Sequence, residues 1–282
     1  MEPVLKWAGG KRQLLKELKK YITKDLIGNH RYFEPFVGGG AVAFSLECSK
    51  LTINDYNKEL INVYLTIKNE PQKLIQELKK HQKHHSKDYY YKIRSLDRNG
   101  KKYQKLSNVA MAARTIYLNK TCYNGLYRVN SEGYYNVPIG KTLQNTIPDI
   151  VMEEKINKLS RYFNNNDVVI KCGDFSESVK DAKKGDVIYF DPPYDYGTDG
   201  FKAYTKIGFS HEDLIRLKNL CDELIKKGCK IIVSNNDTQF VRECFNLKNY
   251  TINSIDAKRY INCKASKRKN AKEVIIFGEK LD

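Results

Sequence analysis

Residues 187–194 of this chain read VIYFDPPY, an apolar run that two prolines interrupt. Four consecutive β-branched or aromatic residues are typical of a buried strand, and the prolines end it because proline lacks an N–H donor. Helical patterns separate several such runs, the clearest over residues 211–227 behind a capping box of Ser210 and Asp213. The sequence therefore predicts an α/β fold with a doubly wound, mainly parallel sheet. The other expected strands are residues 31–37, 51–54, 168–172, 230–233 and 273–277.

The alternation of strands and helices stops after Asp55 and resumes only near Asp167. The stretch between them looks helical, since Pro71 suits the first turn of a helix through Leu78 and residues 108–118 read as another. We therefore expect two domains. One is made of residues 1–56 and 166–282, and the other is an insert over residues 57–165.

The expected insert carries a basic segment and a turn. Residues 73–105 contain 11 Lys or Arg and only three acidic residues. Residues 123–137 hold two extended runs on either side of Ser131-Glu132-Gly133, which predicts a β-hairpin.

The composition is that of a basic globular protein. Of its 282 residues 41% are hydrophobic, and 50 Lys and Arg against 33 Asp and Glu give a formal charge of +17. A field of this sign favours a polyanionic partner, nucleic acid before an anionic membrane surface, and the alternative is a merely soluble basic protein.

Several classes of protein are disfavoured. The sequence contains no run of 18 apolar residues, so we expect no membrane-spanning helix. Residues 1–10 contain no apolar signal segment, so we expect a cytoplasmic protein. The seven cysteines form no CxxC pair and are expected to be reduced. We expect no metal site, because the His81, His84 and His85 cluster has no nearby cysteine and suits a solvated helix face.

The tetrapeptide Asp191-Pro192-Pro193-Tyr194 is the strongest chemical signal, because ligands of open α/β sheets bind at the carboxyl ends of strands. It suits methylation of an exocyclic amine, whose lone pair is delocalised into the base. The Asp191 carboxylate and the Pro192 carbonyl can each accept one N–H bond, which aims the lone pair at a methyl donor. The prolines preset both acceptors, and Tyr194 offers a face on which a flipped base can stack. The alternative is a rigid turn that caps a strand.

A glycine turn, FVGGGAVA at 36–43, follows the first expected strand and fits G-x-G-x-x-A through Gly38, Gly40 and Ala43. Alone it fits dinucleotide binding as well as binding of S-adenosylmethionine (AdoMet). Asp55 ends the next strand, where an acid accepts hydrogen bonds from ribose hydroxyls. Hydride transfer has no use for an Asp-Pro-Pro-Tyr acceptor pair, whereas methyl transfer does, so the two motifs together favour AdoMet.

Two weaker signals concern the same cofactor. In KWAGGK at 6–11, Lys11 can pair with a carboxylate such as that of the AdoMet methionine, and Trp7 can line the pocket; a helix-opening turn is the alternative. Asp174, after the third expected strand, can hydrogen-bond the cofactor's adenine or be a solvated loop acid.

Taken together and in this order, the motifs resemble those of the Dam-type DNA adenine methyltransferases, in the alpha-group arrangement. The sequence looks most similar to members that accompany GATC-cutting restriction enzymes. The resemblance implies a seven-stranded Rossmann-like methyltransferase sheet, and an AdoMet-dependent enzyme that flips adenine out of duplex DNA and methylates its 6-amino group, with a cognate restriction endonuclease as a possible partner. The stretches that carry it are KWAGGK at 6–11, FEPFVGGGAVAF at 33–44, IND at 53–55, YNGLYR at 123–128, NVPIG at 136–140 and DPPY at 191–194.

The resemblance also implies roles for single residues. The expected catalytic residues are Asp191, Pro192, Pro193 and Tyr194. The expected AdoMet contacts are Trp7, Lys11, Pro35, Gly38, Gly40, Asp55, Asp174 and Asp191. The expected DNA contacts are Lys6, Tyr123, Asn124, Leu126, Arg128 and Pro138, with Arg128 suited to the two major-groove acceptors of guanine.

Further positions follow from the same picture. Tyr127 stands where family members vary, and no conclusion on specificity follows from it. Residues 195–209 are expected to form a loop that orders over the flipped base. Phosphates are expected to meet the basic residues of 73–105 and a C-terminal set made of Lys258, Arg259, Lys264, Lys267, Arg268, Lys269 and Lys272.

Three other functions stay open from the residues. The same acceptor geometry suits an RNA adenine or the exocyclic amine of cytosine, although a hairpin fits the major groove of DNA better than that of A-form RNA. A DNA-binding module without catalysis is a second alternative, and a nicotinamide-dependent dehydrogenase is a third.

Overall fold

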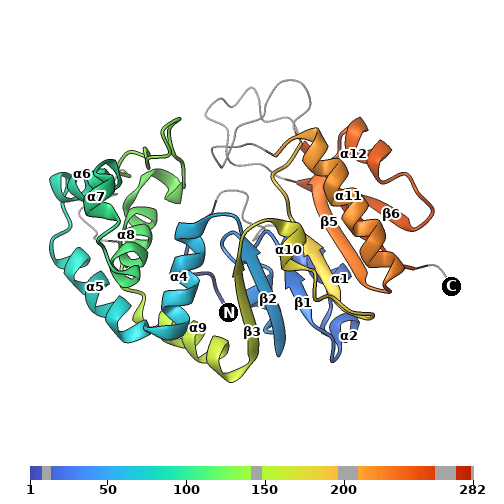
Figure 1. Ribbon diagram of the computed structural model, residues 1–282, viewed down its shortest axis with the longest axis horizontal. Helices are drawn as coiled ribbons and strands as arrows, with labels where there is room; N and C mark the ends of the chain where they lie inside the picture. Colours follow the sequence, from blue (N-terminus) through green and yellow to red (C-terminus); the bar gives the residue numbers. More distant parts are fainter. Residues whose placement is uncertain (8–13, 141–147, 196–208, 258–270, 281–282) are drawn as a thin grey trace.

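A seven-stranded sheet forms the centre of the protein, with strand order β3-β2-β1-β4-β5-β7-β6 (Figure 1). The structure is a computed structural model that describes residues 1–7, 14–140, 148–195, 209–257 and 271–280. Strands β1 to β5 pair in parallel, and β7 runs antiparallel to both β5 and β6. The doubly wound, mainly parallel sheet is thus confirmed. The strands are β1 Tyr32–Glu34, β2 Lys50–Asp55, β3 Asp167–Cys172, β4 Val187–Phe190, β5 Lys230–Asn236, β6 Tyr250–Ala257 and β7 Ala271–Gly278.

Two expectations about the strands were wrong. Strand β1 ends at Glu34 rather than at Val37, because Pro35 cannot donate a ladder hydrogen bond. The chain still follows β2 for a short distance, since the Val37 N–H donates to the Asn54 carbonyl at 2.9 Å. Strand β6 was missed: it lies at the edge of the sheet and half of its residues are polar, so it lacks the apolar run of a buried strand.

Among the described residues, six helices lie outside the insert, two of them before β1 and the others between strands. The predicted helix behind Ser210 is α11, and both halves of its capping box with Asp213 are present. The six are α1 Leu15–Tyr21, α2 Lys24–Ile27, α3 Ala43–Leu46, α10 Phe175–Ser178, α11 His211–Lys226 and α12 Gln239–Cys244.

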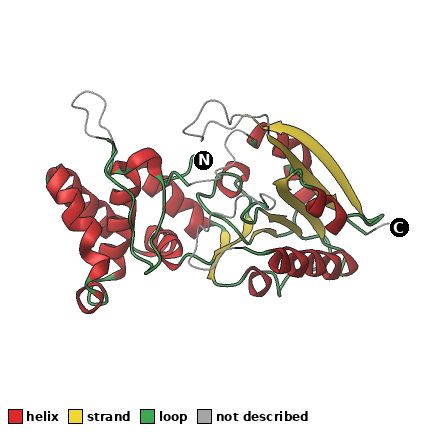
Figure 2. Ribbon diagram, turned by 90° about the horizontal axis from the view of Figure 1, so that it is seen from above, coloured by secondary structure: helices red, strands yellow, loops and turns green. Residues whose placement is uncertain are grey.

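The chain between β2 and β3 is helical, as expected, and lies beside the β3 edge of the sheet (Figures 1 and 2). Pro71 is in the first turn of its helix, and Ser107 caps the helix that begins at Asn108. The helices are α4 Lys58–Asn69, α5 Pro71–Lys83, α6 Lys87–Arg94, α7 Gly100–Tyr103, α8 Asn108–Thr121 and α9 Glu153–Asn165, with 3₁₀ turns η2 Ser95–Arg98 and η3 Tyr123–Gly125.

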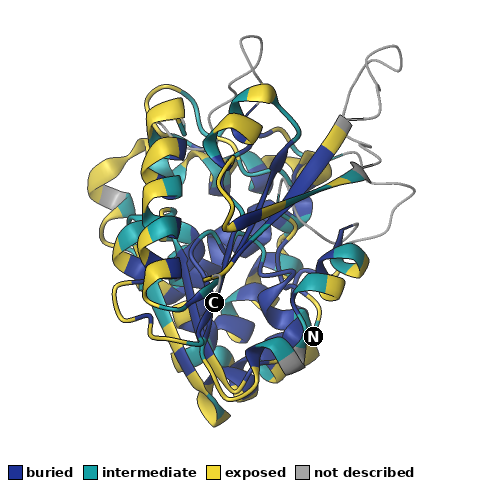
Figure 3. Ribbon diagram, turned by 90° about the vertical axis from the view of Figure 1, so that its right-hand side faces the viewer, coloured by how far each residue is buried: buried dark blue, intermediate teal, exposed yellow. Residues whose placement is uncertain are grey.

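Alternate residues of the central strands β4 and β5 enter two different apolar cores. Tyr189 of β4 packs in the core that continues into helices α4, α5 and α8, whereas Ile188 and Phe190 pack in the core beneath α11. In Figure 3 the central strands are accordingly buried, whereas most residues of the edge strands β3 and β6 are partly or fully exposed. Because one core runs from the sheet into the insert, the insert is anchored next to the carboxyl ends of β1, β2 and β4. The two domains and their boundaries stay a prediction.

The expected hairpin is only partly present. The turn at Ser131-Glu132-Gly133 is found, with Gly133 at φ +90°. Its flanks pair through isolated bridges, Cys122 with Ile139 and Val129 with Tyr135, rather than through continuous strands. The first flank begins as the 3₁₀ turn η3, because Asn124 takes a left-handed conformation with φ +56°. We call residues 123–138 the recognition segment.

Two features are absent from the described residues. Within those ranges no helix is both long and apolar enough to cross a membrane. The same residues contain no group of three or more His, Cys, Asp or Glu side chains that could hold a metal ion.

Candidate active site

The Asp-Pro-Pro-Tyr motif leaves the carboxyl end of β4 in the middle of the sheet. Asp191 is partly exposed, and its Oδ1 accepts a hydrogen bond from the Ser234 hydroxyl at 2.7 Å. Tyr194 exposes only 9% of its surface, and its hydroxyl donates to Glu273 Oε2 at 2.9 Å. The motif is therefore fixed to strands β5 and β7 by its own side chains. The expected loop over residues 195–209 lies outside the described residues, except for its two ends.

The glycine turn lies beside the motif, because β1 and β4 are neighbours in the sheet. Gly38 has φ +47° and Gly40 has φ +72°, a region that side chains disfavour. Asp55 holds this turn: its Oδ2 accepts from the Gly38 N–H at 3.0 Å and its Oδ1 accepts from the Asn57 N–H at 2.9 Å. Burial raises the pKa of Asp55 to about 6, although these backbone hydrogen bonds act in the opposite direction.

Asn54 joins the ends of three strands at the same edge. Its side-chain amide, which is buried, donates to the carbonyls of Pro35 and Gly173, at 3.0 Å each. Pro35 is also buried and thus forms the floor between β1 and β2. The hydrogen bonds of Asn54 therefore fix the backbone at Pro35 and Gly173, next to the expected cofactor site.

Trp7 covers the glycine turn from outside the sheet. A Cβ atom on Gly38 would lie 2.9 Å from Trp7 Cδ1, so these positions must stay glycine for the indole to pack. The indole also stacks on Tyr127, with ring centroids 5.1 Å apart. Trp7 of the KWAGGK motif thus lies at the glycine turn, whereas Lys11 of the same motif lies outside the described residues.

Asp174 has a different set of contacts from the one we expected. It caps α10 through the Ser176 N–H at 3.0 Å, and Arg216 of α11 donates to both of its carboxylate oxygens at 3.1 Å each. Burial alone would raise the pKa of Asp174, but the hydrogen bonds from Ser176 and the Arg216 pair lower it overall. These contacts give Asp174 a structural role, and its contact with a cofactor stays a prediction.

An aromatic cluster lies between the glycine turn and Asp174. Phe36 contacts Phe175 at a ring-centroid distance of 5.3 Å and Phe209 at 5.8 Å. The guanidinium of Arg216 lies 5.1 Å from the Phe175 ring centre. These rings were not predicted as part of the site, because phenylalanines beside strands and helix starts look like ordinary core residues.

The expected DNA contacts share one surface, around the recognition segment. Tyr123, Asn124, Arg128 and Pro138 are exposed and Leu126 is partly exposed. Lys6 lies next to them because one amide, that of Asn119 in α8, donates to the carbonyls of Lys6 at 2.7 Å and Gly125 at 3.1 Å. Arg128 Nε donates to the Asn136 side chain at 2.7 Å. The structure therefore brings together residues 6, 123–128 and 136–138, which are far apart in the sequence.

The comparisons with known proteins bear on this site. Residues 7–261 match the family described as D12 class N6 adenine-specific DNA methyltransferases. The chain belongs to this family. It is 43% identical over 278 residues to the type II methyltransferase M1.LlaDCHI of Lactococcus lactis subsp. cremoris, which covers 98% of this chain and 95% of that one.

Two further relatives extend over the whole chain. The type II methyltransferase M.MjaIII of Methanocaldococcus jannaschii is 39% identical over 286 residues, covering 96% of each chain. The retron Ec67 DNA adenine methylase of Escherichia coli is 32% identical over 279 residues, covering 99% of this chain and 92% of its own. Membership of the family identifies the chain as a DNA adenine methyltransferase, which confirms this part of the expectation from the motifs.

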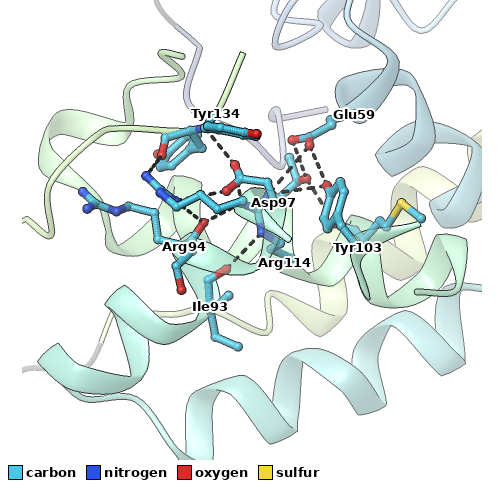
Figure 4. A network of polar contacts seen from close by, with 12 residues as sticks. Glu59, Ile93, Arg94, Asp97, Tyr103, Arg114 and Tyr134 are labelled. Carbon is cyan, nitrogen blue, oxygen red and sulfur yellow. Dashed lines mark hydrogen bonds and ion pairs between the residues drawn. The ribbon is translucent and has the colours of Figure 1, made fainter. Parts of the chain in front are cut away.

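A buried ionic network supports the recognition segment of this methyltransferase (Figure 4). Arg114 of α8 exposes only 1% of its surface and pairs with Asp97 at 2.8 Å and with Glu59 at 3.6 Å. Its Nε and one Nη also donate to the carbonyls of Ile93 and Arg94, at 3.0 and 2.9 Å. Most of the guanidinium donors are therefore satisfied, as a buried charge requires.

The network reaches the recognition segment at two points. Asp97 Oδ2 accepts from the Tyr135 N–H at 2.8 Å, and Glu59 Oε2 accepts from the Tyr127 hydroxyl at 3.3 Å. The Tyr103 hydroxyl donates to the other oxygen of Glu59 at 2.6 Å. Sequence analysis missed these residues, because an arginine in a basic insert looks like one more surface charge.

Glu34 is a second residue that the sequence analysis missed in the methyltransferase site. It ends β1 and exposes only 3% of its surface. Burial, and then the neighbouring Asp191, raise the pKa of Glu34 well above its ordinary value. The sequence signal that could have identified Glu34 is its position in FEPFVGGG, just before the glycine turn.

Proposed function

We propose that this methyltransferase transfers a methyl group from AdoMet to the 6-amino group of adenine in duplex DNA, in the cytoplasm and at GATC sites. The observation that carries the proposal is the position of Asp191. It leaves β4 next to the glycine turn of β1, so one strand spacing of about 5 Å separates the acceptor motif from the turn that suits the cofactor. Membership of an N6 adenine-specific family supports adenine as the base.

The residues present fit AdoMet. Gly38 and Gly40 provide a turn without side chains, and a Cβ on Gly38 would meet Trp7 at 2.9 Å, so the indole defines one wall. Asp55 carries the carboxylate for the ribose hydroxyls, and the Phe36 cluster offers an apolar surface for the adenine. Pro35 lines the floor, and Lys11 is assigned to the methionine carboxylate. When bound, AdoMet supplies an electrophilic methyl group on a sulfonium.

The chain's own residues then prepare the nucleophile. Asp191 and the Pro192 carbonyl accept the two N–H bonds of the adenine amine, which turns the nitrogen lone pair out of the ring system. The buried Tyr194 positions this turn and presents its remaining exposed edge to the flipped base. As the N–C bond forms and the S–C bond breaks, the amine gives up one proton to Asp191 or to water.

DNA is held by two kinds of contact in this proposal. The recognition segment, with Lys6, reads base edges, and lysines of the insert neutralise phosphates. Several lysines of residues 73–105 are already paired on the surface, such as Lys73 with Glu70 and Lys80 with Glu77. Surface pairs of this kind exchange readily for phosphates because each is worth only about 0–1 kcal/mol. The C-terminal basic set lies outside the described residues, except Lys272.

The GATC target rests on the resemblance of the motifs, and the proposed restriction-endonuclease partner rests on two relatives that are named type II methyltransferases. Arg128 supplies the chemistry for a guanine in the target. Its Nε donates to Asn136 Oδ1 at 2.7 Å and the residue is exposed, and the terminal nitrogens of a guanidinium suit the two acceptors of guanine. RNA adenine and DNA cytosine are the alternative substrates.

The test uses labelled AdoMet with a GATC duplex, a duplex with one altered guanine, and a single-stranded RNA of the same sequence. We expect 6-methyladenine, identified by nucleoside mass analysis, in the GATC duplex. Asp191→Ala abolishes transfer while AdoMet binding stays measurable, and Arg128→Ala narrows the difference between the two duplexes. No methylation of any DNA contradicts the function, and equal methylation of both duplexes by the wild-type protein contradicts the target.

A further inference from the structure

We propose that Tyr189 and Ser234 form a hydrogen-bond chain that orients the Asp191 carboxylate for methyl transfer. This inference rests on the proposed function, in which Asp191 accepts an N–H bond of the target base. Both side chains are buried, so we assign them as positioning residues that act through Asp191.

The sheet brings the three side chains to one face. Tyr189 and Asp191 are two residues apart on β4 and its extension, so they point to the same side. Strand β5 pairs in parallel with β4 with Phe190 opposite Val233, which places Ser234 level with Asp191. The distances are 2.9 Å from the Tyr189 hydroxyl to Ser234 Oγ and 2.7 Å from Ser234 Oγ to Asp191 Oδ1.

The donor directions follow from the proton inventory of the chain. An ionised carboxylate accepts only, so Ser234 must give its single hydroxyl proton to Asp191. The Ser234 oxygen then accepts from the Tyr189 hydroxyl, which has a proton to donate. The Tyr189 pKa is raised well above its ordinary value, by burial first and by Asp191 second, so this proton stays in place. The chain thus has one polarity, from Tyr189 through Ser234 to Asp191.

Burial lets this hydrogen-bond chain restrict the orientation of the Asp191 carboxylate. Ser234 exposes 1% of its surface and Tyr189 none, so water does not compete for either hydroxyl. Hydrogen bonds to a charged group in such surroundings are stronger than neutral ones. Asp191 itself is only partly buried, and its free rotation about the side chain would otherwise spread the carboxylate over several orientations. Fixing Oδ1 sets the plane of the carboxylate relative to the incoming amine.

Other ionisable groups surround the same carboxylate. Glu34 approaches from β1, Glu273 from β7 and Tyr194 from the motif itself, where the Tyr194 hydroxyl is bound to Glu273. The hydrogen bond from Ser234 to Asp191 is 2.7 Å long, and its donor is buried. The chain through Ser234 is therefore the contact to remove first.

The experiment measures single-turnover methylation of a GATC duplex together with separate affinities for AdoMet and DNA. Ser234→Ala lowers the single-turnover rate about 10- to 100-fold, the range for one hydrogen bond to a charged group, and changes both affinities less than about twofold. Ser234→Thr keeps the hydroxyl and recovers most of the rate. Tyr189→Phe weakens the chain at its far end, and we expect a smaller loss of about 3- to 10-fold.

Two matched controls separate this role from packing. Ser178 is as buried as Ser234, but its hydroxyl donates to the Phe175 carbonyl at 2.6 Å. Tyr162 likewise donates to the Cys48 carbonyl at 2.7 Å. Ser178→Ala and Tyr162→Phe remove a buried hydroxyl bond away from Asp191, and both should keep the wild-type methylation rate.

The outcomes distinguish this inference from the function on which it rests. If the wild-type protein methylates DNA and Ser234→Ala does so within twofold of its rate, the inference is overturned and the function stands. A loss that Ser234→Thr does not recover, or that Ser178→Ala shares, overturns it as well. If Ser234→Ala fails to fold, a wild-type methylation rate in Tyr189→Phe overturns the inference instead. A wild-type protein that methylates no DNA removes the function and the inference together.

Discussion

Asp55 shows how a single carboxyl group holds the turn to which we assign the cofactor. It ends β2 and holds the glycine turn through the Gly38 N–H, in a place that is buried enough to raise its pKa to about 6. A folded-state pKa above the ordinary value of 3.8 means that ionising Asp55 weakens the folded state, and this cost appears as the pH rises through about 6. The protein tolerates a partly buried charge there, which suits a group that a ligand must contact.

The affinity for AdoMet is therefore expected to depend on pH. Ribose hydroxyls donate to the ionised carboxylate, so binding is strong above pH 6 and weakens as Asp55 takes up a proton below it. Between pH 7.5 and 5.0 we expect an affinity loss of about tenfold, which matches one pH unit below a pKa of about 6. Calorimetric titration of the protein with AdoMet measures it. In Asp55→Asn, binding should be weak and flat over the same range, and a wild-type affinity that does not change would contradict the role.

At the scale of elements, α8 is the helix that carries the insert. Ten of its fourteen residues are buried, among them Arg114. Removing one partner of a buried ion pair leaves an uncompensated charge, so Arg114→Ala should lower the free energy of unfolding by about 3 kcal/mol, with Asp97 and Glu59 left unpaired. Urea unfolding followed by circular dichroism gives the change.

The matched control is Arg216, which also pairs with an aspartate but is half exposed. Arg216→Ala should cost about 1 kcal/mol or less, because exposed pairs are screened by water. Equal losses in the two variants would mean that the network around Arg114 contributes no more than a surface pair.

The same elements explain what the sequence could predict. Buried parallel strands such as β4 are apolar on both faces, α5 begins at Pro71, and Ser210 caps the start of α11, so these elements were found. Strand β6 was missed because an edge strand carries polar residues and so lacks a continuous apolar run. Ser234, Glu34 and Arg114 were missed for another reason: their roles arise from neighbours far along the chain, and each looks ordinary in its local sequence.

On the scale of the whole molecule, Trp7 connects the glycine turn with the recognition segment. Trp7 lies against Gly38 and stacks on Tyr127 at 5.1 Å, and the Tyr127 hydroxyl donates to Glu59 at 3.3 Å. Glu59 lies in the first turn of α4, only four residues after Asp55. A ligand that orders the glycine turn thus also orders the base of the recognition segment, through packed rings and one hydrogen bond.

This contact predicts that AdoMet and DNA bind cooperatively. Coupling between two sites is reciprocal, and about 1–3 kcal/mol is typical. With a non-reactive AdoMet analogue bound, we expect the wild-type protein to bind a GATC duplex about tenfold more tightly, measured by fluorescence anisotropy at fixed salt. Tyr127→Leu should reduce this factor to near one while its affinity for the analogue changes less than about threefold. Tyr127→Phe keeps the stack on Trp7 and loses only the bond to Glu59, so its factor should fall between the two.

A tyrosine outside the contact controls for this effect. Tyr91 of α6 packs against Arg94 and touches neither Trp7 nor Glu59 in the described structure, so Tyr91→Leu should keep the wild-type factor. The +17 charge acts alike on every variant, because attraction of phosphates depends on the total field rather than on one ring. A factor that persists in Tyr127→Leu would therefore assign the coupling to that field or to other contacts, whereas its selective loss assigns it to the stacked rings.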